Sequence, residues 1–185
     1  MNVYDFDKTI YPRDSATDFF CWCARRYPRT LLCLPPAAVT ALRGRRDPQL
    51  HGLVKERIYA FRRFVPDPAA EAAAFWDARL GDVYPWYLDR KRPDDVIISA
   101  SPAFLVGEAC RRLGVECIAT EMDTATGKLL SPNCRGTEKI VRYRTAHGGE
   151  PVDEFYSDSW SDRPMMDIAA AAWRMKKGVP AERVK

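Results

Sequence analysis

Short apolar segments alternate with helical ones from residue 94 onward, and this alternation constrains the fold more than any other feature. The sequence predicts these elements in the order strand 94–99, helix 102–113, strand 115–120, helix 138–146, strand 153–158, helix 164–171 and strand 172–177. Residues 96–98 are apolar without interruption, which is typical of a strand covered on both faces. The alternation therefore predicts a Rossmann-like, doubly wound α/β sheet whose strands are mostly parallel.

A further strand is expected at 2–7, and residues 14–90 then form helix after helix. Asp47 and Asp67 are each followed by proline, which predicts two helix N-caps. After the first of them, apolar side chains recur at helical spacing at Leu50, Val54, Ile58, Phe61 and Val65. The block is too long for an ordinary crossover connection. We therefore expect a core of residues 1–13 and 91–185, with a helical insertion at 14–90 over one end of the sheet.

Composition is that of an ordinary globular protein, with 46% apolar and 29% charged residues. The net charge of +4 is too small to indicate nucleic acid as a partner. Residues 14–93 hold 14 Lys and Arg against 9 Asp and Glu, a modest excess that favours small anions. For Arg43, Arg45 and Arg46, a solvated helical surface is the better interpretation.

Cysteine and histidine usage excludes a zinc site of ordinary spacing. The six cysteines form no Cys-x-x-Cys pair, and the two histidines stand far from any cysteine pair. Buried, reduced thiols are the expected state, which favours a cytoplasmic location. The apolar run at 31–42 is short and holds two prolines, so no membrane span is expected, and no signal peptide is predicted.

Polar side chains stand where the expected strands end. Ligands of a doubly wound sheet bind beyond the carboxyl ends of its strands. The residues at or near those ends are Asp5, Asp7, Ser99, Lys139, Asp158 and Asp162. Four carboxylates brought together would repel one another without a cation. Oxygen ligands without histidine or thiolate indicate Mg²⁺.

Several of these residues have a simpler structural interpretation as well. Asp158 and Asp162 could cap the helix at Pro164. Ser101 followed by Pro102 favours an N-cap, and Lys139 taken alone could be a surface lysine. The opening segment also permits two interpretations, as Asp-Lys-Thr from residue 7 or as an Asp-x-Asp pair from residue 5.

The order and spacing of four motifs resemble the haloacid dehalogenase superfamily of phosphatases. They are Asp5-Phe6-Asp7-Lys8-Thr9, then Ser99, then Lys139, then Ser157-Asp158-x-x-x-Asp162. The resemblance covers the whole chain, and residues 14–90 are similar to that superfamily's helical cap after the first strand (C1 type). The stretch "SDSWSDRPMMDIA" is similar to the branch of phosphoserine phosphatase, subfamily IB.

This resemblance bears on the opening segment. P-type ATPases of the same superfamily continue Asp-Lys-Thr with Gly-Thr, where this chain has Ile10-Tyr11. The namesake dehalogenases lack the second acid and need no metal. The resemblance thus implies that Asp5 is the nucleophile of a Mg²⁺-dependent phosphatase and that Asp7 is its general acid and base.

The resemblance also implies roles for the other residues. Mg²⁺ would be held by Asp5, the backbone carbonyl of Asp7 and Asp158, with Asp162 holding a bound water or orienting Asp158. Ser99 and Lys139 would bind the phosphoryl group, and Thr9 would brace the loop. The expected substrate contacts are Thr9, Asp14, Ser99, Ala100, Ser101 and Lys139. The expected substrate is a small phosphorylated metabolite, and the oligomeric state is left open.

The sequence indicates the identity of the substrate less clearly than the catalytic residues. Asp14 matches the place of a substrate-binding glutamate in phosphoserine phosphatases, but a helix N-cap explains it equally well. Ala100-Ser101-Pro102 replaces a Gly-Gly-Phe stretch of those enzymes, which argues against phosphoserine. Aromatic residues make the cap more apolar than an amino-acid phosphate requires; they are Phe19, Phe20, Trp22, Tyr27, Trp86 and Tyr87. Most are expected in the cap core, and a few could line a pocket for a larger organic phosphate.

Two alternative functions remain open. One is a phosphotransferase that passes the phosphoryl group of the same aspartyl-phosphate to an acceptor other than water. The other is a catalytically silent protein that binds a phosphorylated ligand.

Overall fold

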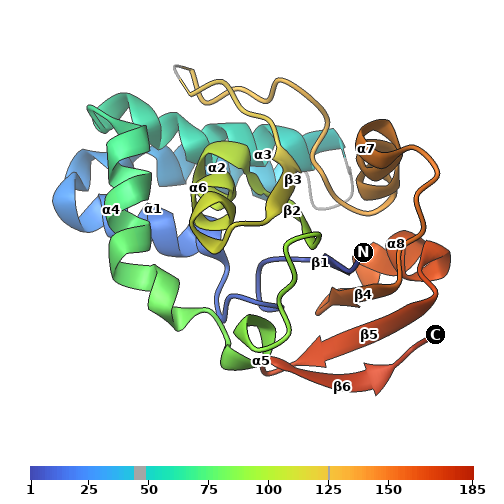
Figure 1. Cartoon of the computed structure of the whole chain (residues 1–185). Coiled ribbons are helices and arrows are strands. Elements are labelled where there is room, and N and C mark those ends of the chain that lie inside the picture. The colour runs from blue at the N-terminus through green and yellow to red at the C-terminus, as the bar shows by residue number, and fades with distance from the viewer. Residues whose placement is uncertain (44–48, 125) are drawn as a thin grey trace.

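One mostly parallel sheet organises the computed structural model, which describes residues 1–43, 49–124 and 126–185 (Figure 1). The strands are β1 (Val3–Tyr4), β2 (Val96–Pro102), β3 (Glu116–Thr120), β4 (Glu154–Ser157), β5 (Ala171–Lys176) and β6 (Val179–Arg183). Their spatial order is β3-β2-β1-β4-β5-β6, parallel as far as β5 and antiparallel between β5 and β6. The strand order reverses beside β1, and ligands of such sheets bind at this reversal.

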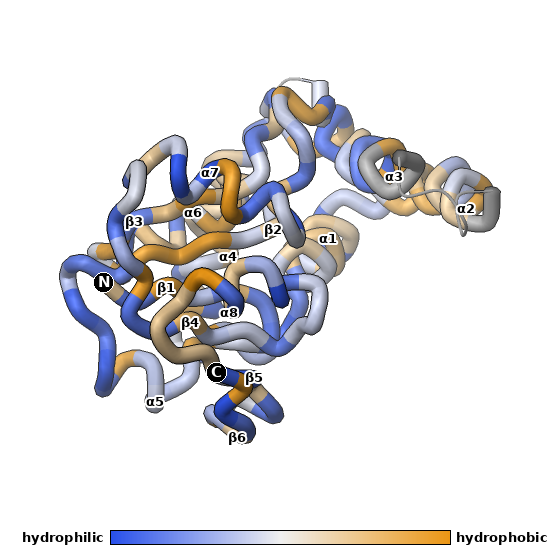
Figure 2. Tube along the Cα trace, turned by 90° about the vertical axis from the view of Figure 1, so that its right-hand side faces the viewer, coloured by the Kyte–Doolittle hydropathy of each residue, from blue (hydrophilic) through white to orange (hydrophobic). Residues whose placement is uncertain are grey.

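Between β1 and β2 the described residues form helices, which confirms the expected helical insertion after the first strand. They are α1 (Ser15–Arg26), η1 (Pro28–Cys33), α2 (Leu34–Arg43), α3 (Gln49–Tyr59), η2 (Ala60–Phe64), α4 (Pro68–Arg79), η3 (Leu80–Asp82) and α5 (Pro85–Leu88), where η marks a 3₁₀ helix. The later helices are α6 (Ala103–Leu113), α7 (Thr137–His147), η4 (Trp160–Asp162) and α8 (Arg163–Ile168). In Figure 2 the α2–α3 pair projects to one side of the sheet.

Two expected helix ends are confirmed. The Asp67 carboxylate accepts from the N–H groups of Ala69 and Ala70, both at 3.0 Å, and so caps α4. Gly114 closes α6 in the left-handed conformation with φ of 69°. The cap expected at Asp47 lies outside the described residues. The apolar residues that follow it do not share one helix, because α3 ends at Tyr59. Phe61 and Val65 lie beyond that end and are buried there.

Three expectations about elements were wrong. Ser101 and Pro102 do not cap α6 through the serine side chain, because β2 continues through both residues. The first strand covers only Val3–Tyr4 instead of 2–7. The antiparallel strand β6 was not expected, because its residues are mostly exposed and carry no buried apolar pattern.

Both faces of the sheet are covered, as the apolar strands predicted. Tyr4 and Phe6 belong to one buried cluster with aromatic residues of the helical insertion, such as Phe19 and Phe75. Val3 belongs to a second cluster on the opposite face, with residues of α7 and α8. Successive side chains of β1 thus enter layers on opposite faces of the sheet.

The helix α5 packs against the central strand. The Tyr87 ring meets the Tyr4 ring edge-on at 5.0 Å between centroids, and the Trp86 ring lies 6.2 Å from the same ring. This contact joins the end of the helical insertion to the sheet. The division at residues 90 and 91 stays a prediction.

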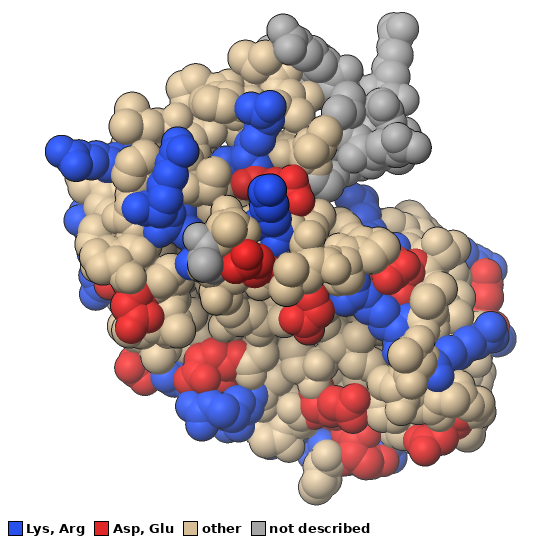
Figure 3. Space-filling model, turned by 90° about the horizontal axis from the view of Figure 1, so that it is seen from above, with Lys and Arg blue, Asp and Glu red and all other residues tan. Residues whose placement is uncertain are grey.

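Surface charges are interspersed on the face shown in Figure 3, where Lys and Arg alternate with Asp and Glu. Among the described residues, no helix combines the length and the apolar character that a membrane crossing requires.

Candidate active site

The loop after β1 carries the two leading carboxylates. The Asp5 N–H donates to the Tyr156 carbonyl at 2.8 Å, which extends the pairing with β4 by one residue. Phe6 is fully buried, and its carbonyl accepts from three N–H groups at 3.0–3.3 Å, those of Thr9, Ile10 and Tyr11. Lys8 adopts the left-handed conformation with φ of 58°, which lets the chain turn back tightly. The turn directs Asp5 and Asp7 into one pocket.

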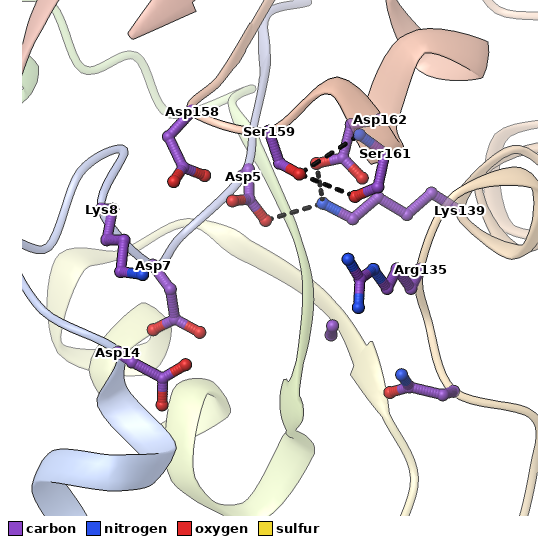
Figure 4. A pocket seen from close by; sticks show the side chains of 12 residues that line it. Asp5, Asp7, Lys8, Asp14, Arg135, Lys139, Asp158, Ser159, Ser161 and Asp162 are labelled. Atoms are coloured by element: carbon purple, nitrogen blue, oxygen red, sulfur yellow. Dashed lines mark hydrogen bonds and ion pairs between the residues drawn. The ribbon is translucent and has the colours of Figure 1, made fainter. Parts of the chain in front are cut away.

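This pocket has a volume of about 260 Å³ and lies at the carboxyl ends of β1 and β4 (Figure 4). Its lining comes from distant parts of the chain: Asp5, Asp7, Lys8, Asp14, Ala100, Asn133, Arg135, Lys139, Asp158, Ser159, Ser161 and Asp162. Five carboxylates and three cationic side chains thus face the same small space. Such a lining suits an anion bound together with a cation.

Lys139 lies between two of these carboxylates. Its Nζ donates to Asp5 Oδ1 at 2.6 Å and to Asp162 Oδ2 at 2.7 Å, and the lysine is only 1% exposed. Ser157 Oγ donates to the same Asp162 oxygen at 2.8 Å. Asp162 occupies the N-cap position of α8 but makes no side-chain capping bond; its carboxylate instead holds Lys139 in place.

The charges of this group shift one another. Burial raises the pKa of Asp5, the Lys139 ammonium opposes that rise, and the Asp162 carboxylate adds to it. Burial acts to lower the pKa of Lys139, but the two carboxylates outweigh it and raise that pKa above its usual value. The lysine therefore stays protonated at neutral pH and supplies a fixed positive charge beside Asp5.

Asp7 has different partners. Its Oδ1 accepts from the Ser15 N–H at 2.8 Å, and its Oδ2 accepts from Ser101 Oγ at 2.6 Å. Burial raises the pKa of Asp7, although the hydrogen bond from Ser101 acts in the opposite direction. The side chain is thus held at the start of α1, on another side of the pocket from Lys139.

Asp158 faces the pocket from the end of β4, and its N–H donates to Thr9 Oγ1 at 3.0 Å. Thr9 is fully buried and is not among the lining residues, and its predicted contact with the substrate stays a prediction. Burial raises the pKa of Asp158, and the nearby Lys8 opposes the rise.

The segment after Ser99 is arranged differently from the expectation. Ser99 is fully buried, and its Oγ accepts from the Ser101 N–H at 3.0 Å instead of lining the pocket. Ala100 lines the pocket, whereas Ser101 reaches it through its bond to Asp7. The predicted phosphoryl contact of Ser99 stays a prediction.

The N-cap interpretation of Asp14 is confirmed, whereas its contact with a substrate stays a prediction. Its Oδ1 accepts from the Thr17 N–H at 2.8 Å and caps α1, and the residue also lines the pocket.

Sequence reasoning missed several residues of this site. Asn133 and Arg135 belong to the segment between β3 and α7 and line the pocket. Arg135 stands shortly before Lys139, and a second cation next to a predicted anion site was a usable signal. Lys55 of α3 donates from Nζ to the Ala100 carbonyl and to Asn133 Oδ1. The contact of Lys55 with these two residues depends on where α3 lies relative to the sheet, which no local sequence pattern reveals.

The carboxylates of the pocket are donors of the kind that Mg²⁺ prefers. Among residues 1–43, 49–124 and 126–185, no group of three or more His, Cys, Asp or Glu side chains has the arrangement of a complete metal site. Asp5 and Asp158 nevertheless line the same pocket, and both supply hard oxygen atoms. Mg²⁺ commonly uses one or two carboxylates and completes its shell with waters and substrate phosphate. The residues therefore fit this ion.

Comparison with known proteins identifies the family. Residues 3–167 match the family model of the haloacid dehalogenase-like hydrolases. The chain belongs to this family. It is 29% identical to Protein CicA of Caulobacter vibrioides, over 97% of this chain and 87% of that protein.

Solved structures share the fold. A Bordetella pertussis Tohama I protein of unknown function has a TM-score of 0.76 at 19% identity, covering 94% of this chain and 88% of that one. A phosphoserine phosphohydrolase-like protein from Francisella tularensis has a TM-score of 0.54 at 11% identity, covering 94% and 87%. The expected α/β fold with a helical insertion after the first strand is confirmed.

Proposed function

We propose that this hydrolase is a Mg²⁺-dependent phosphatase that cleaves a small organic phosphate monoester through an aspartyl-phosphate on Asp5. One observation carries the proposal. The buried Lys139 ammonium lies 2.6 Å from Asp5 Oδ1, at the base of a pocket that also contains Asp7 and Asp158. Phosphoryl transfer needs a positioned nucleophile and fixed positive charge around the phosphoryl oxygens.

In the first step the free Asp5 oxygen attacks phosphorus, and the bond to the leaving oxygen breaks. The Lys139 ammonium neutralises part of the developing charge without moving, because Asp162 also holds it at 2.7 Å. The side chain of Arg135 lines the same pocket and offers further donors to the phosphoryl oxygens.

Asp7 supplies the proton. Its raised pKa favours the protonated form that a general acid needs, and Ser15 and Ser101 fix its side chain. It donates to the leaving oxygen and then takes a proton from the water that hydrolyses the aspartyl-phosphate. Asp5 is thereby restored, and the products are an alcohol and inorganic phosphate.

Asp5, the Asp7 carbonyl and Asp158 would hold Mg²⁺, with Asp162 in a supporting position. When bound, this ion neutralises charge on the phosphoryl oxygens and keeps them in line with the nucleophile.

The remaining parts of the proposal concern the context of the site. We assign residues 14–90 as a C1-type cap and the chain to the phosphoserine phosphatase-like branch, subfamily IB, on the motif resemblance given above. A cytoplasmic location and the absence of a nucleic-acid partner stay predictions.

Release of phosphate from p-nitrophenyl phosphate tests the proposal, with and without Mg²⁺. We expect metal-dependent turnover that falls by at least about 10³-fold in Asp5→Asn. Asp89→Asn, at an exposed position outside the pocket, is the matched control and keeps full activity. Turnover that survives in Asp5→Asn would refute the aspartyl-phosphate, and faster transfer to an added alcohol than to water would favour the phosphotransferase.

A further inference from the structure

A second cavity adjoins the proposed active site. It has a volume of about 340 Å³ and is lined mainly by apolar groups of the helical insertion: Asp14, Ala16, Thr17, Phe20, Leu34, Val54, Lys55, Ile58 and Tyr59. Its exposed lining is predominantly apolar, in contrast to the charged pocket beside it. An apolar cavity with a few polar groups at its edge is typical of a small-molecule site.

The two cavities share a wall. Asp14 lines both of them. Lys55 lines the apolar cavity, and its ammonium contacts Ala100 and Asn133, which line the charged pocket. These contacts tie α3 to the end of β2 and to the segment before α7. The apolar cavity therefore lies directly beside the charged pocket, with Asp14 and Lys55 at the boundary between them.

The position of Asp7 indicates which part of a substrate would enter the apolar cavity. A general acid must lie within hydrogen-bond reach of the leaving oxygen. Asp7 is held by the N–H of Ser15, the first residue of α1, and the first two turns of that helix bring Ala16, Thr17 and Phe20 into the cavity lining. A substituent on the leaving oxygen thus extends from Asp7 along α1.

The charges of the cavity do not suit a zwitterionic substituent. Among its described lining residues, Asp14 and Lys55 are the charged ones. The Lys55 ammonium is directed to the Ala100 carbonyl and to Asn133 Oδ1, and one Asp14 oxygen accepts from the Thr17 N–H. An amino-acid group would find few polar partners there apart from the second Asp14 oxygen, whereas an alkyl or aryl group would bury apolar surface against Val54 and Ile58.

We propose that the second cavity binds the apolar part of the substrate, so that the enzyme acts on phosphate monoesters of alcohols with an extended apolar chain. The inference rests on the proposed function for the orientation of the ester. Its test is a binding measurement, which does not depend on turnover.

The probes are n-alkylphosphonates from methyl to hexyl, titrated calorimetrically into the Mg²⁺-loaded protein. They share one headgroup and cannot be hydrolysed at the carbon–phosphorus bond. Each methylene that enters the cavity should raise the affinity about fourfold, until the cavity is filled.

Two variants assign this gain to the cavity. Val54→Ser replaces a half-buried lining residue with a polar one and should lower the ratio of hexyl to methyl affinity about tenfold. Thr17→Trp acts differently: it fills the cavity from the exposed side of α1 and should end the gain at a shorter chain. Leu88→Ser on α5 lies outside both cavities and should keep the native ratio.

The outcomes separate the two proposals. An affinity that does not change with chain length, or a gain that Val54→Ser and Thr17→Trp both leave intact, overturns the inference even if the enzyme hydrolyses p-nitrophenyl phosphate. A gain that both variants reduce, in a protein without phosphatase activity, supports the cavity assignment and contradicts the proposed function.

Discussion

Lys139→Met tests how the buried charges of the site are balanced. Methionine keeps an unbranched side chain of similar length but has no ammonium group. The native ammonium lies 2.6 Å from Asp5 and 2.7 Å from Asp162, whose exposed fractions are 8% and 2%. The substitution therefore leaves two carboxylates in a buried site without their shared partner.

Removal of one partner from a buried ion pair costs about 3–5 kcal/mol, because the other charge stays buried without compensation. We expect this loss in the free energy of unfolding at neutral pH, in the absence of divalent cations. It is a large share of the roughly 5–15 kcal/mol that stabilises a typical domain. Activity should fall with it, since Asp5 loses the positive charge beside it.

The loss should depend on pH in a defined direction. Burial already raises the pKa of Asp5, and Lys139 opposes that rise, so the variant should raise this pKa further. When the pKa of a carboxyl group in the folded protein exceeds its unfolded value of about 3.9, the folded state becomes more stable as pH falls from the folded pKa toward the unfolded one. The difference between native protein and variant should therefore shrink on acidification from neutral pH to about pH 5.

Urea unfolding followed by circular dichroism, at several pH values with a chelator present, measures this difference. Lys128→Met is the matched control, because that lysine is exposed in a loop, and its loss should stay within about 0.5 kcal/mol. A Lys139→Met variant that loses less than about 1 kcal/mol, or whose loss is the same at every pH, would refute the argument.

Two further predictions concern positions outside the site. Gly178→Ala should cost about 2–4 kcal/mol in unfolding free energy, because φ is +76° there and an added Cβ would collide with the Tyr84 ring. Gly107→Ala inside α6 meets nothing within 4 Å and should instead stabilise by about 0.5–1 kcal/mol; equal effects of both substitutions in urea unfolding would contradict this reasoning. Hydrogen bonds from two arginines of the same helix lower the pKa of Glu108 to about 2. The contribution of Glu108 to the free energy of unfolding is therefore present above its unfolded pKa and is lost as pH falls toward 2. Glu108→Gln should cost no more than about 1 kcal/mol at neutral pH, because water screens this ion pair, and a difference that persists below about pH 2 would exclude the pair as its cause.

Much of the site could be predicted because parallel strands bring their carboxyl ends to one edge. Asp5 and Asp158 follow neighbouring strands β1 and β4, so their convergence follows from the sheet order alone. Lys139 could be placed by its position at the start of a helix that returns to the same edge. Its contact with both Asp5 and Asp162 needed the structure, because a helix start does not fix where a long side chain ends.

Ser101 shows why local patterns fail at such an edge. A serine before proline is a strong capping signature, but the signature considers only the next few residues. Here the Ser101 hydroxyl bonds Asp7, which lies far away in the sequence, and β2 extends through the position. The same limit hid Lys55, whose partners Ala100 and Asn133 belong to other elements. At Ser101, a hydrogen bond to a residue distant in the sequence replaced the capping bond that the local pattern predicts.

In the proposed mechanism the two acids of the opening segment have different roles, and their surroundings give the reason. β1 ends at Tyr4, but the Asp5 N–H still pairs with β4. Asp7 instead belongs to the turn in which three N–H groups donate to the Phe6 carbonyl. The turn gives the two carboxylates different surroundings, an ammonium for Asp5 and hydrogen bonds from Ser15 and Ser101 for Asp7. Two acids so close in sequence can thereby serve as nucleophile and as proton donor, since different environments are what separate the roles of paired acids.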